Sequence, residues 1–197
     1  QPCRKTPLSS SPHPDKSSLR RKLRQQRAAL AHSERLQAEL AAARQAVRRG
    51  LLRPGKRIAA SIPVGSEFSP WPLILMALKR GVEVYLPQVP RRGRQMRFVR
   101  FDQHAHWVNG KYDIPELQSG QACPTRQLDT VFLPLVGFDS EGSRLGQGGG
   151  YYDATFAFRR NRQHWKKPRL IGLAFACQRV DYLPRDHWDL RLDAVLP

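Results

Sequence analysis

Residues 129–153, with the sequence DTVFLPLVGFDSEGSRLGQGGGYYD, decide the fold. They open with an apolar run over 129–138 that is typical of a buried strand and is broken late by Pro134 and Gly137. A glycine-rich loop follows, then a short helical pattern over 152–160 and a second apolar strand over 170–175. The order strand, helix, strand predicts an α/β layered domain with a mainly parallel sheet.

The segments on either side of this stretch fit the same fold class. The further expected strands are RIAASIP at 57–63, VEVYL at 82–86, MRFVRF at 96–101 and a short terminal strand at 194–196. The MRFVRF segment alternates in polarity, which is typical of an exposed or edge strand. A helix is predicted over 71–80, because Pro70 and Pro72 open it and Gly81 ends it.

Two amphipathic helices are predicted near the N-terminus. The first begins with Asp15 or Ser17 as its cap, and the second begins with Ser33 as its cap and stops at Gly50. Residues 1–14 are rich in Pro and Ser and have no apolar period, which predicts a disordered tail. We therefore expect one domain over 15–197.

Composition and charge narrow the range of possible functions and partners. The 197 residues contain 34 Lys and Arg against 16 Asp and Glu, a formal net charge of +18. Residues 1–53 alone carry 13 Lys and Arg against three acids, so anionic partners such as phosphate esters, polycarboxylates or nucleic acid are expected. No apolar run approaches the roughly 20 residues of a membrane span.

The cysteines indicate the compartment rather than a site. The sequence contains three cysteines, and their wide spacing excludes a disulfide scaffold and a CxxC zinc site. Such cysteine usage is typical of a reducing, cytoplasmic setting. Cys123 and Cys177 have no activating neighbour in the sequence, so we expect them to be structural.

The loop RLGQGGGYYD, residues 144–153, is the strongest candidate site. Its glycines allow positive φ and close approach of the backbone to a ligand, and their N–H groups together with the following helix form a nest suited to phosphate. Arg144 adds a positive charge, and Asp153 is a candidate ligand for the Mg²⁺ that accompanies a nucleotide. The loop has neither the Lys-Ser/Thr pair of a Walker A motif nor the spacing of a dinucleotide fingerprint, and a flexible loop is the alternative.

Three other features are weaker candidates. Lys16 and Arg20 share one helix face, which is either a grip for polyphosphate or a solvated basic surface. Glu67 follows the first strand, where open α/β sheets bind ligands, and its carboxylate suits an amino-heterocycle such as a pterin or a purine; an ordinary loop acid is the alternative. Tyr112 lies in a turn-rich segment and is either a stacking platform for a flat ligand or a surface aromatic.

Two pairs of residues suggest a metal. His104 and His106 are two residues apart, which places them on one face of a strand, but a pair without a third ligand is a weak metal site. Asp189 and Asp193 are four residues apart near the C-terminus, and one of them is a candidate to complete a Mg²⁺ shell. Surface acids are the alternative for this second pair.

Together these features resemble the 5-formyltetrahydrofolate cyclo-ligase (methenyltetrahydrofolate synthetase) family. The match runs from about Lys16 to the C-terminus, and its most specific part is RLGQGGGYYD, close to the family signature R-L-G-x-G-x-G-Y-Y-D. The Lys16-x-x-x-Arg20 pair, the segment from Ile62 to Glu67, the Tyr-Asp-Ile-Pro-Glu turn and the closing Asp-x-x-x-Asp support it. The family's three-layer α/β/α fold agrees with the pattern of strands and helices.

The resemblance implies an ATP- and Mg²⁺-dependent conversion of 5-formyltetrahydrofolate to 5,10-methenyltetrahydrofolate with release of ADP and phosphate. In the family's scheme the formyl oxygen attacks the γ-phosphate, N10 closes on the activated carbon, and phosphate leaves. We further expect a monomeric, cytoplasmic enzyme without a membrane partner, and the basic surface suits a polyglutamylated folate tail.

The resemblance also implies roles for individual residues. The catalytic residues are Lys16, Arg144 and Asp153. The ATP-binding residues are Lys16, Ser17, Ser18, Leu19, Arg20, Arg144, Leu145, Gly146, Gln147, Gly148, Gly149, Gly150, Tyr151 and Tyr152. The folate-binding residues are Ile62, Glu67, Tyr112, Gln147, Gly148, Gly149, Gly150 and Tyr151, and the Mg²⁺ ligands are Asp153 and Asp189.

Two alternative functions remain open. A nucleic-acid-binding protein would explain the basic N-terminal quarter, but it leaves the glycine loop unexplained, and the sequence contains no zinc finger, recognition helix or aromatic-basic RNA motif. The other alternative is a relative that binds folate or nucleotide without turnover, because Gln147 and Gly149 stand where many relatives carry Arg and Lys.

Overall fold

The computed structural model describes residues 15–162 and 164–197, and the predicted tail over 1–14 lies outside the described residues. Its helices are α1 (Lys16–Ala28), α2 (His32–Arg48), α3 (Trp71–Lys79) and α4 (Tyr151–Thr155), with the 3-10 helices η1 (Lys111–Asp113), η2 (Thr125–Gln127), η3 (Ala157–Asn161) and η4 (Ala176–Gln178). Its strands are β1 (Arg57–Ala59), β2 (Glu83–Gln88), β3 (Arg97–Phe101), β4 (Trp107–Asn109), β5 (Pro115–Leu117), β6 (Ala122–Cys123), β7 (Thr130–Pro134), β8 (Gly137–Phe138), β9 (Arg144–Leu145), β10 (Arg169–Leu173) and β11 (Ala194–Leu196).

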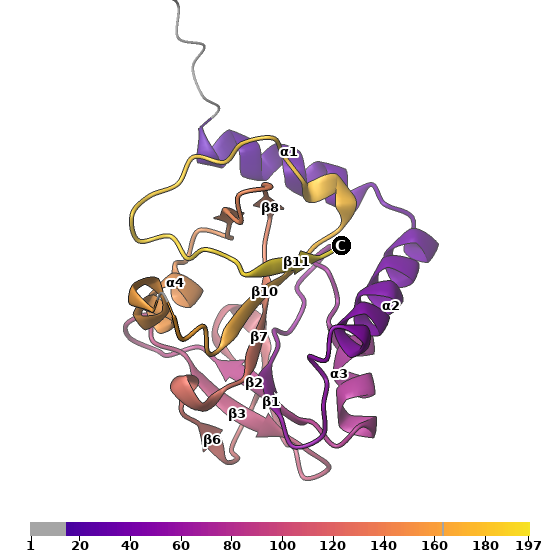
Figure 1. Cartoon of the computed structure of the whole chain (residues 1–197), viewed down its shortest axis with the longest axis vertical. Coiled ribbons are helices and arrows are strands. Elements are labelled where there is room, and N and C mark those ends of the chain that lie inside the picture. The colour runs from indigo at the N-terminus through magenta and orange to yellow at the C-terminus, as the bar shows by residue number, and fades with distance from the viewer. Residues whose placement is uncertain (1–14, 163) are drawn as a thin grey trace, which may run out of the picture.

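A central sheet carries helices on both faces (Figure 1). Helices α2 and α3 cover one face, α4 and η3 lie on the other side, and α1 lies across one end of the molecule. This is the three-layer α/β/α architecture that the sequence predicts. None of the described helices combines the length and the apolar character needed to cross a membrane.

The order of the strands places a crevice near β1. The seven-stranded sheet has the order β11-β10-β7-β1-β2-β3-β6. β1 is parallel to both β2 and β7, and β10 is parallel to β7 and β11, whereas β3 is antiparallel to β2 and β6. The chain builds outward from β1 in one direction through β2 and in the other through β7. Such a switch point, at the carboxyl ends of the strands, is where open α/β sheets bind ligands.

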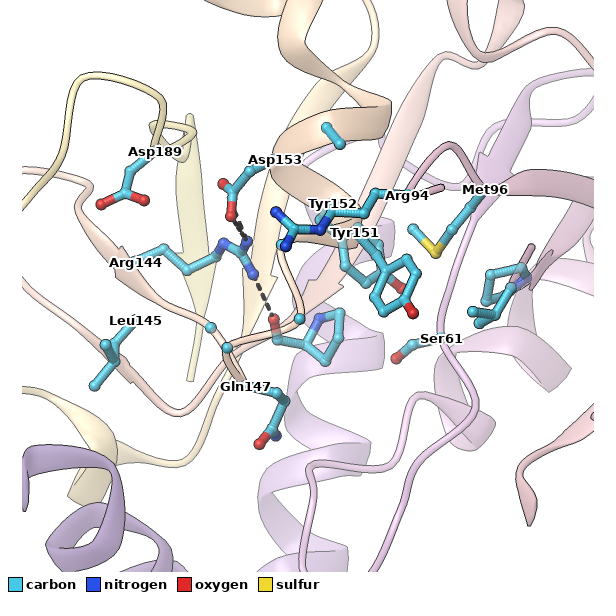
Figure 2. Close-up of a pocket in the computed structure, with 18 of the residues that line it drawn as sticks. Ser61, Arg94, Met96, Arg144, Leu145, Gln147, Tyr151, Tyr152, Asp153 and Asp189 are labelled. Atoms are coloured by element: carbon cyan, nitrogen blue, oxygen red, sulfur yellow. Dashed lines mark hydrogen bonds and ion pairs between the residues drawn. The ribbon is translucent and has the colours of Figure 1, made fainter. Parts of the chain in front are cut away.

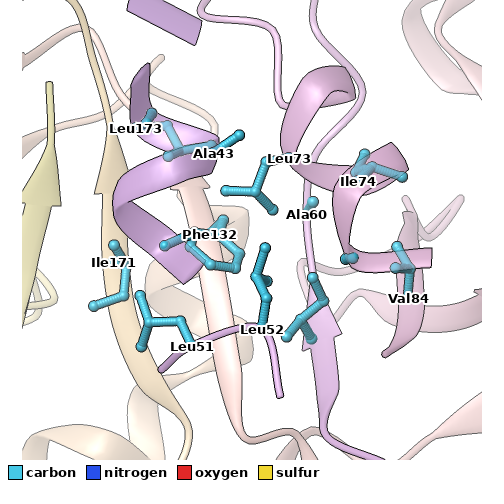
Figure 3. Packing of buried hydrophobic residues seen from close by; sticks show 14 of the residues in the cluster. Ala43, Leu51, Leu52, Ala60, Leu73, Ile74, Val84, Phe132, Ile171 and Leu173 are labelled. Carbon is cyan, nitrogen blue, oxygen red and sulfur yellow. The ribbon is translucent and has the colours of Figure 1, made fainter. Parts of the chain in front are cut away.

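Apolar side chains bury the sheet on both faces. On one face, Ala43 from α2 and Leu73 from α3 lie close to Phe132 of β7, and all three are almost completely buried (Figure 3). On the other face, Phe156 follows α4 and packs against Phe98 of β3 with ring centroids 5.6 Å apart. Parallel sheets need this cover on both sides, which explains the apolar residues of β7. The single strand predicted over 129–138 is divided, however, because β7 ends at Pro134 and β8 pairs with β9 in a separate two-stranded sheet.

Helix α1 has a small apolar cluster of its own. Leu19 and Leu23 pack with Val136, Leu145 and Leu183. Leu145 is the last residue of β9, which pairs with β8 in a hairpin immediately before the glycine loop. The basic helix is therefore held beside that loop.

Three further local predictions were wrong. Helix α2 begins one residue before Ser33, because the Glu34 carboxylate accepts a hydrogen bond from the Ala31 N–H (3.0 Å) and supplies the cap from inside the helix. β1 ends at Ala59, since the chain then leaves the sheet towards the crevice. The MRFVRF strand is not an edge strand, because β6 pairs along its other side.

Candidate active site

A cavity of about 720 Å³ opens at the switch point of the sheet. Ser61 and Ile62 border it just after β1, Pro87 lies at the end of β2, and Pro134 lies at the end of β7. The predicted site residues that line it are Lys16, Arg20, Ile62, Glu67, Tyr112, Arg144, Leu145, Gly146, Gln147, Gly148, Gly149, Gly150, Tyr151, Tyr152, Asp153 and Asp189. One cavity thus collects residues from across the chain.

Three predicted ATP-binding residues do not line this cavity. Ser17 and Ser18 are exposed on α1, and Leu19 packs in the apolar cluster beneath the helix. Helix geometry explains the difference, because Lys16 and Arg20 are four residues apart and share a face, whereas Ser17 and Ser18 lie on the exposed side of the helix and Leu19 points into the apolar cluster. Only the outer pair of this segment, Lys16 and Arg20, faces the cavity.

The glycine loop presents its backbone to the cavity. Gly148 has φ of +107° and Gly150 has φ of +69°, which L side chains rarely adopt. Arg20 donates from Nε to the Gly146 carbonyl (2.8 Å), so α1 fixes the start of the loop. At its end, Arg94 covers Gly150 so closely that a Cβ there would lie 3.3 Å from Nη1.

Arg144 is a buried cation with an unused donor. Its side chain is 5% exposed, and Nη2 lies 3.3 Å from both carboxylate oxygens of Asp153 (Figure 2). Nη1 donates to the Pro134 carbonyl (3.3 Å), and the guanidinium lies 5.8 Å from the Tyr152 ring centre. Among the described residues no acceptor meets Nε, which is also buried. A buried donor without a partner is costly, so this N–H favours a ligand oxygen at the same place.

Tyr152 borders the cavity but belongs mainly to the core. Its ring stacks on Phe156 with an interplanar angle of 16°. Burial raises the pKa of its hydroxyl far above the usual value, so the phenol stays neutral. The Tyr152 ring therefore offers the Arg144 guanidinium a neutral aromatic neighbour.

Lys16 joins two acids that line the same cavity. Its Nζ lies 2.6 Å from Asp186 Oδ2 and 3.0 Å from Asp189 Oδ2. Burial lowers the pKa of Lys16, but the hydrogen bonds and charges of the two carboxylates outweigh it and raise that pKa. Asp189 also accepts the Asp186 N–H (2.8 Å), and Leu190 N–H donates to Asp153 (2.9 Å), so the two predicted metal ligands are carried side by side.

The choice between Asp189 and Asp193 follows from their partners. Asp193 is held away from the cavity by Arg159, which donates from Nη2 (2.9 Å), and by the Leu170 N–H (2.7 Å). The two acids lie in an irregular segment rather than on a helix, so their spacing in the sequence does not place them together. Asp189 is the one that borders the cavity.

Glu67 lines the same cavity as Arg144. Its Oε2 accepts the Val64 N–H (3.0 Å) and its Oε1 accepts the Gln147 amide Nε2 (2.6 Å). Burial raises the pKa of the Glu67 carboxyl, while these hydrogen bonds and the nearby Arg27 lower it in part. The carboxylate is thus fixed from two sides and still lines the cavity.

The hairpin of β4 and β5 reaches the glycine loop through Tyr112. The Tyr112 hydroxyl lies 3.0 Å from the Tyr151 hydroxyl, and Lys111 Nζ donates to the same Tyr151 oxygen (3.1 Å). The hydrogen bonds from Tyr112 and Lys111 lower the pKa of Tyr151. Tyr112 itself has φ of +63°, a strained conformation that costs about 1–3 kcal/mol and that clusters at active sites and ligand clamps.

Several cavity residues escape sequence reasoning. Arg94 and Met96 come from the segment before β3, and Met96 N–H is anchored by Thr155 Oγ1 (3.0 Å). Asp186 and Trp188 come from the irregular segment before β11. These residues belong to no motif, and a single side chain in an irregular segment does not indicate in the sequence which part of the fold that segment approaches.

The histidine prediction was wrong. His104 and His106 lie in a turn and an irregular stretch before β4, not on a strand. Among the described residues, no group of three or more His, Cys, Asp or Glu is arranged to hold a metal. Burial raises the pKa of Cys123 and of Cys177, which agrees with the structural role expected for both.

Comparison with known proteins gives one family throughout. The model of the 5-formyltetrahydrofolate cyclo-ligase family matches residues 12–197. The 5-formyltetrahydrofolate cyclo-ligase of Haemophilus influenzae is 33% identical over 186 residues, which cover 92% of this chain and 96% of the relative. The mouse protein of the same name is 31% identical over 188 residues, covering 92% of each chain.

A solved structure agrees with the sequence relatives. The NMR structure of 5,10-methenyltetrahydrofolate synthetase from Aquifex aeolicus is 30% identical, with a TM-score of 0.77 over 92% of this chain and 88% of that one. Similarity in sequence and in fold therefore extends over nearly the whole described domain.

Proposed function

The chain belongs to the 5-formyltetrahydrofolate cyclo-ligase family, and we propose that it uses ATP and Mg²⁺ to convert 5-formyltetrahydrofolate to 5,10-methenyltetrahydrofolate, ADP and phosphate. The observation that carries this proposal is the buried Arg144, whose Nε lacks an acceptor, at the glycine loop of the cavity that Glu67 also lines. A cation for phosphate and a carboxylate for a heterocycle in one cavity fit a reaction between two ligands.

The nucleotide end is formed by cations and by the loop backbone. Lys16 and Arg20 from α1 line the same cavity as Arg144, and so does the loop from Gly146 to Gly150. Phosphoryl transfer needs positioning and charge neutralisation more than a strong side-chain base. Arg144 supplies a fixed charge, because its neighbours hold it in one orientation, and its free N–H matches a phosphate oxygen.

Asp153 and Asp189 would hold Mg²⁺. Carboxylate oxygens are its preferred protein ligands, and it commonly takes only one or two of them together with substrate phosphates and water. The residues fit, since the two acids border one cavity and are linked through Leu190. When bound, the ion neutralises phosphate charge; in the structure Arg144 and Lys16 balance the same two carboxylates.

The folate end is formed by Ile62, Glu67, Tyr112 and Tyr151. Ionised Glu67 accepts hydrogen bonds from the amino group and ring N–H of a pterin, and the two tyrosines offer flat apolar surfaces. Gln147 lies between this end and the nucleotide end, since it bonds Glu67 and belongs to the glycine loop. We infer that the loop aligns the two ligands.

The chain's residues position three atoms in succession. The formyl oxygen attacks the γ-phosphorus, and the bond to ADP breaks. N10 of the folate then bonds the activated formyl carbon and loses its proton, and phosphate leaves with the former formyl oxygen. Lys16, Arg20 and Arg144 lower the repulsion between oxygen and phosphate in the first step.

The test follows the near-ultraviolet absorbance of 5,10-methenyltetrahydrofolate after mixing the protein, 5-formyltetrahydrofolate and ATP, with and without Mg²⁺. We expect a rise that requires both ATP and Mg²⁺ and that falls by at least about a hundredfold in Asp153→Asn, which keeps an oxygen for the Leu190 N–H. A flat trace from folded wild type would contradict the proposal. Retained folate binding without turnover would indicate the non-catalytic alternative.

A further inference from the structure

A chain of two short hydrogen bonds links α1 to Glu67. Arg24 donates from Nη2 to Gln147 Oε1 over 2.6 Å. The Gln147 amide donates in turn from Nε2 to Glu67 Oε1, also over 2.6 Å. Arg24 is not part of the cavity wall, so its hydrogen bonds reach the site through Gln147.

The first bond determines the orientation of the second. A guanidinium has only donors, so Arg24 can meet only the oxygen of the Gln147 amide, and the NH₂ group must then face Glu67. Without Arg24 the amide is free to turn over and to bring its oxygen towards the carboxylate, which is a repulsive contact. In Figure 2 Gln147 points away from the Arg144–Asp153 pair, so its amide serves the folate end.

We propose that Arg24 is a positioning residue for folate recognition, acting through Gln147 on Glu67. The inference rests on the proposed function, because it concerns the same carboxylate. Glu67 is held on Oε2 by the Val64 N–H (3.0 Å) and on Oε1 by Gln147, which fixes its plane. A carboxylate fixed in this way offers its remaining lone pairs in one direction, as bidentate recognition of two pterin N–H groups requires.

Arg24 also supports folate recognition through its charge, which helps to keep the Glu67 carboxyl ionised. The charged and titratable groups packed around this carboxylate are Arg24 and Arg27 from α1, Arg35 from α2 and Tyr152 from α4. Burial raises the pKa of Glu67, and the Gln147 hydrogen bond and the Arg24 charge both lower it. Removing Arg24 therefore raises the pH at which Glu67 becomes ionised and able to accept.

The chain places its positive charge behind position 147 rather than at it. Here Gln147 is neutral and the guanidinium stands one side chain further back, on α1. Moving the charge to 147 should therefore replace Arg24, because an arginine there would pair with Glu67 directly.

Isothermal titration of 5-formyltetrahydrofolate into the full chain, without ATP, tests the proposal. We expect binding about tenfold weaker in Arg24→Ala, an intermediate value in Arg24→Lys, and recovery towards wild type in Arg24→Ala/Gln147→Arg. Lys22→Ala is the control, because Lys22 is exposed on α1 without a hydrogen bond or ion pair to the described residues and its loss removes the same charge. On lowering the pH, folate affinity should fall at a higher pH in Arg24→Ala than in wild type.

Three results would overturn the inference. The first is an Arg24→Ala variant that binds folate as Lys22→Ala does. The second is weaker binding of a non-hydrolysable ATP analogue with folate affinity unchanged, which would make Arg24 a phosphate-binding cation. The third is no recovery in the double variant. A wild type that binds folate but does not turn it over would refute the proposed function and leave this inference standing.

Discussion

Replacing Asp153 with alanine should destabilise the fold more than a typical surface change. The substitution removes the carboxylate 3.3 Å from Arg144, whose side chain is 5% exposed, and the acceptor of the Leu190 N–H. Loss of one partner from a buried pair costs about 3–5 kcal/mol of the free energy of unfolding. Because the Asp153 side chain is 20% exposed, water can partly replace it, and we expect a loss of about 2–4 kcal/mol.

The opposite substitution should be milder. Arg144→Met has a similar shape and leaves Asp153 its Leu190 hydrogen bond and its access to water, so we expect a loss of about 1–2 kcal/mol. The double variant Arg144→Met/Asp153→Ala contains no buried charge at this place. It should therefore be more stable than Asp153→Ala alone, although it carries one more substitution.

Urea unfolding at pH 7, followed by tryptophan fluorescence, measures these differences by linear extrapolation. As a control, the dependence of the unfolding free energy on urea concentration should be the same in all variants, which shows that the same transition is being compared. The reasoning is refuted if Asp153→Ala lies within about 0.5 kcal/mol of wild type, the range of an ordinary surface substitution. A double variant less stable than both single variants would refute it as well.

Three more perturbations test the cavity. Folate affinity should fall as the pH drops through the pKa of Glu67, which burial raises, and this limb should disappear in Glu67→Gln; a titration series from pH 4.5 to 7 that is the same for both proteins would contradict it. Gly150→Ala (φ +69°) and Gly55→Ala (φ +75°) should each lose about 1 kcal/mol of stability, but only Gly150→Ala should lose turnover, because nothing lies within 4 Å of the added Cβ at Gly55. Lys16→Met should raise the KM for ATP by about tenfold or more, whereas Lys22→Met on the same helix should not; equal steady-state constants for the two would remove Lys16 from the site.

The order of the longer helices and of the main strands of the sheet could be predicted from the sequence, because each of them rests on a local signal. The apolar run over 129–138 and the glycines that follow it predict a strand and a sharp turn wherever they occur. Pro72 and Gly81 bound α3 for the same reason. The short strand β6 lacks such a signal, since two residues carry no period, so the edge of the sheet was misplaced.

The site could be predicted only where a motif reports its own geometry. The glycine loop does so, and Lys16 with Arg20 does so through helix periodicity. The Arg24–Gln147–Glu67 chain joins residues more than 70 positions apart, and no local pattern encodes such contacts. The prediction for the histidine pair failed because a spacing of two residues places side chains on one face only in a strand, and these residues are not in one.

The fate of the formyl oxygen is the measurement to make first. Wild-type protein would be given ATP, Mg²⁺ and 5-formyltetrahydrofolate labelled with oxygen-18 in the formyl group, and the released phosphate would be analysed by mass spectrometry. Attack of the formyl oxygen on the γ-phosphate predicts one labelled oxygen in each phosphate, in a one-to-one ratio with 5,10-methenyltetrahydrofolate. Unlabelled phosphate formed alongside the product would contradict phosphoryl activation of the formyl group and the role assigned to Arg144.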